Sequence, residues 1–282
     1  MATSTSQPAH NGQFGVYTKP VYINPIAQEV QDTFDGIYAQ VVSFVQNPNS
    51  AINGLIVSGD AGTGKTYTVK KALRDTGHQK NVEYIKGGKI TAASLYVKLY
   101  LNAAKHRIVI LDDCDLIHHH EKNQIVPMLL GAVDLGQSRE VSWETARKNP
   151  LMTEHNVPSN FKFEASVIWI TNDRKSDIGK AIKQWKNAIF SRFNFAECNF
   201  SDEQKFMYTD HLVRNLDMLG TTCQDFPGGY PRPIIDEAAE YMGKNYRHLV
   251  EVTPRQAVKI ADIMHHNADP KLRSTMLQQL WK

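Results

Sequence analysis

The sequence predicts an α/β fold with a doubly wound parallel sheet of five strands, followed by a small C-terminal all-α domain. Two observations predict it. Short apolar runs typical of buried strands alternate with helical patterns as far as Cys198. From Asn199 onward only helical patterns follow. At 282 residues the chain has room for one large domain or two modest ones.

The α/β domain is expected over residues 22–198. Residues 1–21 are rich in Ser, Thr, Gly and Pro, which predicts a flexible N-terminal arm. A helix should begin at Pro25, because Asn24 is a plausible cap and apolar residues then recur at steps of three and four. The expected strands are residues 55–58, 82–85, 108–111, 167–171 and 193–198. The expected helices between them are residues 67–74, 91–104, 122–133 and 178–185.

The all-α domain is expected over residues 199–282. Its predicted helices cover residues 201–219, 234–246, 253–266 and 270–280. Two other segments read as irregular. The Lys86-Gly87-Gly88-Lys89 stretch predicts a loop, and residues 136–165 predict a long polar insertion that is functional or mobile.

Composition limits the function classes. The formal net charge of +3 neither demands nor excludes nucleic acid. Three widely spaced cysteines without a C-x-x-C pair suit a reducing cytosol and argue against a disulfide scaffold or zinc site. No apolar run approaches the ~20 residues of a membrane span, and no secretory signal is seen. We therefore expect a cytoplasmic protein without a membrane partner.

One stretch carries the strongest chemical signal. It fits G-x-x-x-x-G-K-[ST], the phosphate-binding loop called Walker A, and it lies between an expected strand and an expected helix. Glycines let backbone N–H groups point at phosphate oxygens. A glycine-rich turn that binds nothing is the disfavoured alternative. The predicted ATP-binding residues are Gly59, Asp60, Ala61, Gly62, Thr63, Gly64, Lys65, Thr66 and Tyr67.

Polar residues follow two other strands. Asp112 and Asp113 come directly after the apolar strand 108–111, the Walker B pattern. Asp112 is predicted to hold Mg²⁺ opposite Thr66, and Asp113 to act as general base on the attacking water. Two carboxylates that merely cap a strand end are the alternative. Asn172, at the end of strand 167–171, is predicted to hold the water or the γ-phosphate, or else to be a turn residue.

Two arginines are further candidates. Arg192, in Ser191-Arg192-Phe193, is either a partly buried surface residue or an arginine finger for a neighbouring subunit. Arg255 could reach back to the phosphates from the all-α domain. The run from His118 to His120 predicts a solvated turn, since consecutive side chains do not point the same way.

Together these motifs resemble the AAA+ ATPases over about residues 22–282. Asn172 matches sensor 1, Arg192 matches the arginine finger, and Thr253-Pro254-Arg255 matches sensor 2 of the helical lid. More narrowly, "DDCD" and "FKFEASVIWITN" look similar to stand-alone AAA+ proteins of bacteriophages, which implies the host cytoplasm. The resemblance implies a homo-oligomer, usually a hexameric ring with ATP between subunits. It also implies a pore loop, for which Lys86–Lys89 and Tyr96 are candidates.

The resemblance leaves several functions open. The first is an ATP-hydrolysing motor on DNA or on a replication or recombination complex, such as a helicase or clamp loader. The second is a protein remodeller or unfoldase. The third is a nucleotide-gated assembly module with little hydrolysis, suggested because Asp113 stands where the family usually has Glu. A small-molecule kinase is disfavoured, since a kinase needs neither a finger in trans nor a helical lid with its own Arg.

Overall fold

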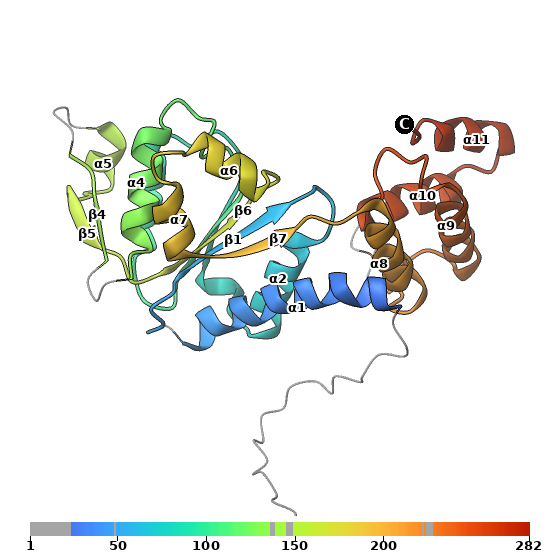
Figure 1. Cartoon of the computed structure of the whole chain (residues 1–282), viewed down its shortest axis with the longest axis horizontal. Helices are drawn as coiled ribbons and strands as arrows, with labels where there is room; N and C mark the ends of the chain where they lie inside the picture. Colours follow the sequence, from blue (N-terminus) through green and yellow to red (C-terminus); the bar gives the residue numbers. More distant parts are fainter. Residues whose placement is uncertain (1–23, 48, 136–138, 145–148, 222, 224–227) are drawn as a thin grey trace, which may run out of the picture.

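The computed structural model of the chain describes residues 24–47, 49–135, 139–144, 149–221, 223 and 228–282 (Figure 1). The predicted arm, residues 1–21, lies outside these described residues.

A five-stranded parallel sheet forms the centre of the α/β part. Its order is β2-β3-β6-β1-β7, and each neighbouring pair runs parallel. All residues of β1 and β6 are buried, as expected for central strands covered on both faces. The prediction of a doubly wound parallel sheet of five strands is therefore confirmed. The strands are β1 (Gly54–Gly59), β2 (Val82–Gly88), β3 (Ile108–Cys114), β6 (Ser166–Ile170) and β7 (Phe193–Cys198).

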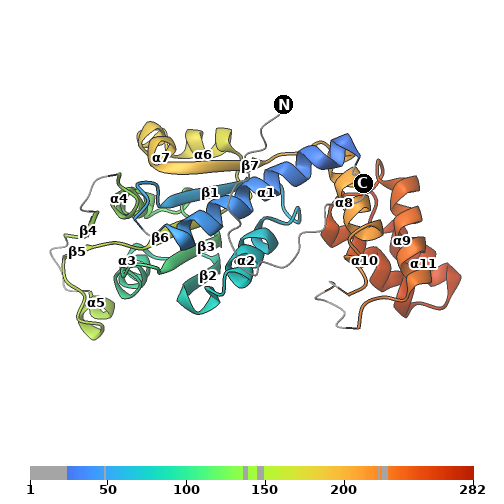
Figure 2. The same ribbon diagram turned by 90° about the horizontal axis from the view of Figure 1, so that it is seen from below.

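Helices cover both faces of this sheet (Figures 1 and 2). Two apolar clusters, one on each face, hold the layers together, because each helix buries one apolar stripe against the strands. On one face lie α1 (Pro25–Gln46) and α2 (Lys65–Asp75), and the short η1 (Gln79–Asn81) precedes β2. On the other face lie α3 (Ala92–Leu101), α4 (Lys122–Ala132), α6 (Lys175–Ala181) and α7 (Lys186–Arg192).

The last four helices pack around a third, separate apolar cluster, and we call them the lid. Helix α1 extends past the sheet to reach α8 (Figure 1), and there the Phe34 and Tyr208 rings stack with centroids 5.3 Å apart. This contact joins the α/β part to the lid. The lid consists of α8 (Asp202–Arg214), α9 (Arg232–Asn245), α10 (Pro254–His266) and α11 (Pro270–Gln278).

The insertion before β6 is more regular than the sequence predicts. Strands β4 (Glu140–Ser142) and β5 (Asn160–Lys162) pair antiparallel, and α5 (Pro150–Glu154) lies between them in the chain. Residues 136–138 and 145–148 of this segment lie outside the described residues. Each strand carries a single buried residue, Val141 or Phe161, so neither shows a readable period in the sequence.

Other expectations also need correction. Residues 86–88 are not loop but the end of β2, because Lys86 pairs with Asp112 and Gly88 with Cys114 of β3. The helix expected over 178–185 begins earlier, at Lys175, and ends at Ala181 (α6); a turn follows, and α7 then begins at Lys186, where the sequence analysis expected no helix. Helix α8 ends at Arg214 rather than near residue 219. Tyr96 is fully buried in α3, so it is not a pore-loop residue.

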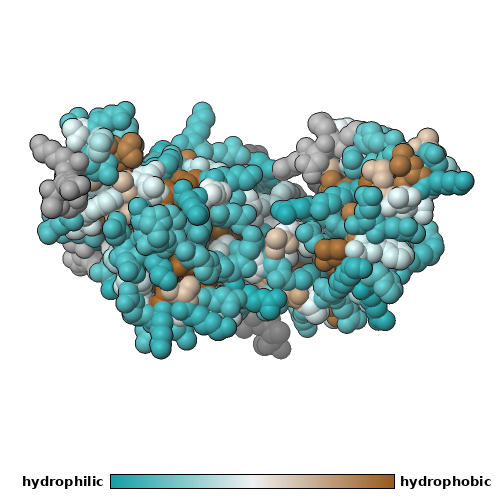
Figure 3. Space-filling view, turned by 90° about the horizontal axis from the view of Figure 1, so that it is seen from above, coloured by the Kyte–Doolittle hydropathy of each residue, from teal (hydrophilic) through white to brown (hydrophobic). Residues whose placement is uncertain are grey.

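On the face seen in Figure 3, apolar side chains are scattered over a mostly hydrophilic surface rather than gathered in one continuous patch. None of the helices in the described ranges is long and apolar enough to cross a membrane.

Candidate active site

The loop between β1 and α2 has the backbone of a phosphate cradle. Gly59, Gly62 and Gly64 have φ values of 124°, 74° and 113°, in the region that favours glycine. A Cβ on Gly59 would lie 2.2 Å from the carbonyl oxygen of Cys198, which no side chain would tolerate. Because Lys65 opens α2, the N–H groups of the first helical turn face the same place. The loop therefore fits the phosphates of a nucleotide.

Lys65 lies at the centre of this cradle. It is 5% exposed, and its Nζ donates hydrogen bonds to the carbonyl oxygens of Gly59 and Asp60, at 2.7 and 2.8 Å. A third bond, of 3.1 Å, reaches Oδ1 of Asn172 at the end of β6. Burial lowers the pKa of Lys65. Nearby carboxylates, including that of Asp113, raise this pKa but only partly offset the effect of burial. The site thus holds a poorly solvated cation where phosphate charge would arrive.

Thr66 and Asp112 meet across the loop. The Thr66 hydroxyl donates a 2.9 Å hydrogen bond to Oδ1 of Asp112, which is 3% exposed. A hydroxyl and a carboxylate are the hard oxygen donors that Mg²⁺ takes in nucleotide sites. This donor set fits Mg²⁺, and Thr66 and Asp112 are the residues that would hold it.

Tyr84 of β2 is a site residue that the sequence analysis missed. Its hydroxyl donates a hydrogen bond to Oδ2 of Asp112, the oxygen that Thr66 leaves free. Burial together with this bond raises the pKa of Tyr84, so the phenol stays protonated and remains a donor. The ammonium of Lys70 lies 4.4 Å from the centroid of its ring. A tyrosine in a strand is typical of any sheet, so no local signal marks this role.

Asp113 and Asn172 face each other above the sheet. Asn172 Nδ2 donates a 2.8 Å hydrogen bond to Oδ1 of Asp113. Asp113 has φ of 54°, a left-handed conformation that is uncommon for a residue with a side chain and that clusters at functional sites. This turn of the backbone leaves Asp113 exposed while Asp112 beside it is buried. The amide of Asn172 thereby connects Lys65 to the predicted base.

The two arginines lie in different places. Arg255, at the start of α10, is next to the loop: a Cβ on Gly62 would be 3.5 Å from that of Arg255. Arg192 ends α7 and is paired through Nε with Oδ1 of Asp134, at 2.9 Å, rather than with its own loop. The structure therefore brings Arg255, but not Arg192, to this copy of the site.

The remaining candidate residues differ in their surroundings. Lys98 forms an ion pair with Glu83 at 2.5 Å, whereas Lys86 and Lys89 are exposed. The run from His118 to His120 is not the fully solvated turn that the sequence predicts, because His118 contacts Asp173 at 3.0 Å and His119 is buried. Within the described ranges no group of three His, Cys, Asp or Glu side chains is arranged to hold a metal.

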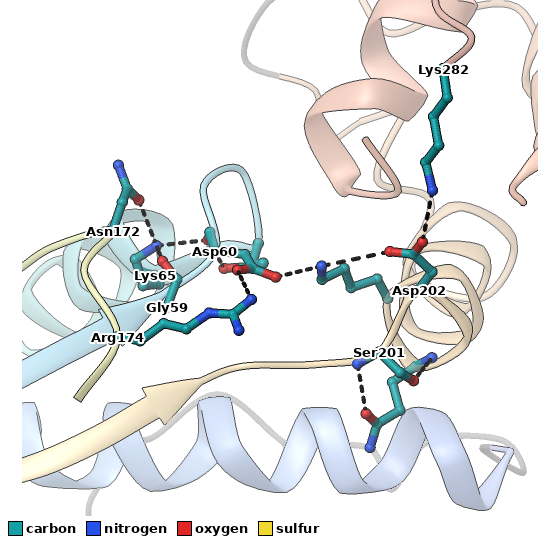
Figure 4. A network of polar contacts seen from close by, with 11 residues as sticks. Gly59, Asp60, Lys65, Asn172, Arg174, Ser201, Asp202 and Lys282 are labelled. Carbon is teal, nitrogen blue, oxygen red and sulfur yellow. Dashed lines mark hydrogen bonds and ion pairs between the residues drawn. The ribbon is translucent and has the colours of Figure 1, made fainter. Parts of the chain in front are cut away.

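The lid also contacts the loop. Lys205 of α8 forms an ion pair with Asp60, which Arg174 approaches from the other side (Figure 4). A narrow, mainly apolar pocket opens beside the same loop. The sequence analysis did not predict it, because its walls come from four segments that are distant in the chain. Its lining residues are Val30, Phe34, Thr63, Phe200, Lys205, Tyr208, Val252 and Pro254.

The region that contains this site is similar to known proteins. Residues 55–194 match the model of the ATPase family associated with various cellular activities (AAA). A phage protein, described as an uncharacterized 36.7 kDa protein in the nrdC-mobD intergenic region of Enterobacteria phage T4, is 29% identical over 220 residues. The alignment spans 77% of this chain but only 65% of the phage protein.

Solved structures agree on the fold. Two mutant structures of RuvB from Thermotoga maritima align over 92% of this chain and 71% and 70% of theirs. Their TM-scores are 0.52 and 0.51, at 12% and 13% sequence identity. RuvB is described in a further structure as a Holliday junction branch migration motor. From β1 to the beginning of β7, around the loop that holds Lys65 and Thr66, this chain matches the AAA family of ATPases.

Proposed function

We propose that the protein is an ATPase that works as an oligomeric motor on DNA or on a DNA-processing complex. The observation that carries the hydrolytic part is the hydrogen-bonded line Lys65–Asn172–Asp113, which lies beside the Thr66–Asp112 contact. The amide of Asn172 connects a phosphate-binding cation, Lys65, to an exposed carboxylate, Asp113. Phosphoryl transfer to water requires a cation on the phosphates and a group that positions the water.

Each residue has a distinct role in this proposal. The loop amides and Lys65 bind the β- and γ-phosphates, and Thr66 and Asp112 hold Mg²⁺. When bound, Mg²⁺ neutralises charge on the phosphate oxygens. Asp113 orients the attacking water and accepts its proton, while Asn172 fixes the carboxylate. Asp113 is one methylene shorter than glutamate, and its left-handed backbone supports its reach toward Asn172.

The adenine ring is proposed to bind at the mouth of the apolar pocket, whose enclosed space of about 10 Å³ is too small to take the ring itself. The pocket adjoins Thr63 of the loop, and its lining includes Phe34 and Tyr208, which stack on each other; apolar and aromatic side chains are typical of sites that bind flat ligands. Arg255, whose Cβ lies beside Gly62 of the loop, is proposed to contact the phosphates. In this proposal the nucleotide is therefore enclosed by the loop, α1 and the lid.

Oligomerisation is proposed because Arg192 does not contact the nucleotide site of its own chain. Arg192 lies at the end of α7, and its guanidinium is paired with Asp134. We propose that it acts in the site of a neighbouring copy as an arginine finger. A hexameric ring in the cytoplasm, or the host cytoplasm of a phage, is the assembly that we propose.

DNA is the proposed polymer for two reasons. RuvB, which shares the fold, is described as a motor on Holliday junctions. Lys86 and Lys89 are exposed at the carboxyl end of β2, and exposed lysines bind phosphate backbones without regard to sequence. Both features support a DNA substrate over a protein one.

The test is steady-state ATP hydrolysis against protein concentration, with no DNA, single-stranded DNA or double-stranded DNA, and with Lys65→Ala as the inactive control. A rate per subunit that rises with concentration and again with DNA is the expected result. Concentration-dependent hydrolysis indifferent to DNA would reject the DNA motor in favour of a protein remodeller. ATP binding without turnover would favour the nucleotide-gated assembly module.

A further inference from the structure

Asp60 occupies a position of the phosphate-binding loop at which the Walker A pattern specifies no residue type. Cationic side chains from both the α/β part and the lid contact it. Its Oδ2 lies 2.5 Å from Nζ of Lys205, in the first turns of lid helix α8. Its Oδ1 lies 3.4 Å from Nη2 of Arg174, which precedes α6 in the α/β part. Figure 4 shows Asp60 between Arg174 and α8, with Asp202 of α8 beyond it. The carboxylate thus bridges the loop and the lid.

The backbone of the same residue holds the phosphate-binding lysine. The Asp60 carbonyl oxygen accepts hydrogen bonds from Nζ of Lys65 at 2.8 Å and from the hydroxyl of Thr63 at 3.0 Å. A displacement of Asp60 therefore changes the position of Lys65. Asp60 therefore contacts the lid through its side chain and Lys65 through its main chain.

The Asp60–Lys205 pair is not an ordinary surface ion pair. The side chain of Lys205 is 14% exposed and that of Asp60 is 25% exposed, so solvent screens their attraction less than that of an exposed pair. Burial opposes ionisation of Asp60, but Lys205 and then Arg174 outweigh it and hold the pKa of this carboxyl below its usual value. Lys205 and Thr63 of the loop also both line the apolar pocket.

We propose that Asp60 and Lys205 form a latch that holds the lid on the phosphate-binding loop and thereby sets the rate of nucleotide release. The proposal rests on the nucleotide binding proposed above. Both are positioning residues: Lys205 holds Asp60, and Asp60 holds Lys65. When the latch opens, Lys65 loses a fixed partner and the nucleotide leaves faster.

Arg174 makes the latch reversible. Breaking a partly buried ion pair is costly when it leaves a carboxylate without a partner. Arg174 belongs to the α/β part and stays near Asp60 when α8 moves away, so the open state keeps one counter-ion. Removing Arg174 would make opening less favourable, the opposite of removing Lys205.

The test measures dissociation of a fluorescent ADP analogue with Mg²⁺ by stopped flow. Lys205→Met and Asp60→Asn should each release it about five- to tenfold faster, as expected for loss of about 1 kcal/mol. The double variant should be no faster than the faster single variant, because the two residues act through one contact. Arg174→Met, which removes a cation from the same carboxylate, should release the analogue at or below the wild-type rate.

Two results would overturn the latch. Effects of Lys205→Met and Asp60→Asn that multiply would show independent contacts with the nucleotide. Faster release from Arg174→Met would show that the charge of Asp60 matters and its contact with the lid does not. Thermal unfolding of each variant checks that it folds.

A nucleotide-free measurement separates the latch from the proposed function. Hydrogen exchange over residues 59–66 and 201–208 should be faster in Lys205→Met than in Arg174→Met, even if the wild type binds no ADP analogue. Equal exchange in the two variants would refute the latch whatever the outcome for ATP.

Discussion

Tyr84→Phe is the most discriminating change at this site, because it deletes one oxygen atom from the support of the proposed magnesium ligand. In the wild type, Asp112 is 3% exposed and its two oxygens accept from Thr66 and Tyr84. The substitution leaves Oδ2 of a buried carboxylate without its phenol donor. The ring itself, and its packing below Lys70, stay in place.

The expected magnitude follows from the charge of the acceptor. A hydrogen bond to a charged group contributes about 1.5–3 kcal/mol, and leaving the buried acceptor unsatisfied costs a similar amount. We expect the free energy of unfolding to fall by about 2 kcal/mol. Loss of a side chain that orients a metal ligand weakens metal binding by about 10–100-fold, so the half-saturating Mg²⁺ concentration for nucleotide binding should rise about tenfold.

The assay pairs denaturant unfolding with a Mg²⁺ titration of fluorescent nucleotide binding. Tyr38→Phe is the matched control. The Tyr38 hydroxyl donates a 3.3 Å bond to Asp75, a carboxylate that is 34% exposed, so its loss should change stability by less than about 1 kcal/mol and leave the Mg²⁺ dependence unaltered. An unchanged Mg²⁺ midpoint in Tyr84→Phe would refute the positioning role, even if stability fell.

Three further outcomes are expected. Asp113→Asn should bind ATP as the wild type does but lower kcat by about 10²-fold or more, since it removes the proposed base; unchanged turnover in a steady-state assay would reject that role. Arg192→Ala should retain nucleotide binding and lose about 10³-fold in hydrolysis, and mixing it with Asp113→Asn subunits should restore activity, whereas no restoration would argue against a finger in trans. Lys205 and Arg174 outweigh burial and hold the pKa of Asp60 below its usual value, so its contribution to stability is present above the pKa of the unfolded state and is lost as the pH falls through the lowered pKa of the folded state. Acid unfolding followed by circular dichroism should therefore be shallower for Asp60→Asn than for wild type, and identical curves would contradict the ion pair.

The sequence predicts an element well when the residues that specify it lie within that element or directly beside it. Buried parallel strands are apolar along most of their length, so the runs of apolar residues in β1, β3 and β6 are recognisable in the sequence. Helix caps are also local: the side chains of Asn24 and Thr253 accept the bonds expected of them. By contrast, β4 and β5 have three residues each and exist only because they pair with one another, so residues 136–165 gave no strand signal.

The sequence by itself determined the phosphate-binding loop and the meeting of Thr66 with Asp112. Glycines at fixed spacing specify the loop, and the carboxyl ends of parallel strands always meet at one edge of the sheet. Only the tertiary structure decided which side chains support that edge. Tyr84 reaches Asp112 because β2 lies beside β3, and Lys205 reaches Asp60 because α8 packs over the loop. Such contacts depend on packing between segments far apart in the chain, and no local pattern encodes their partners.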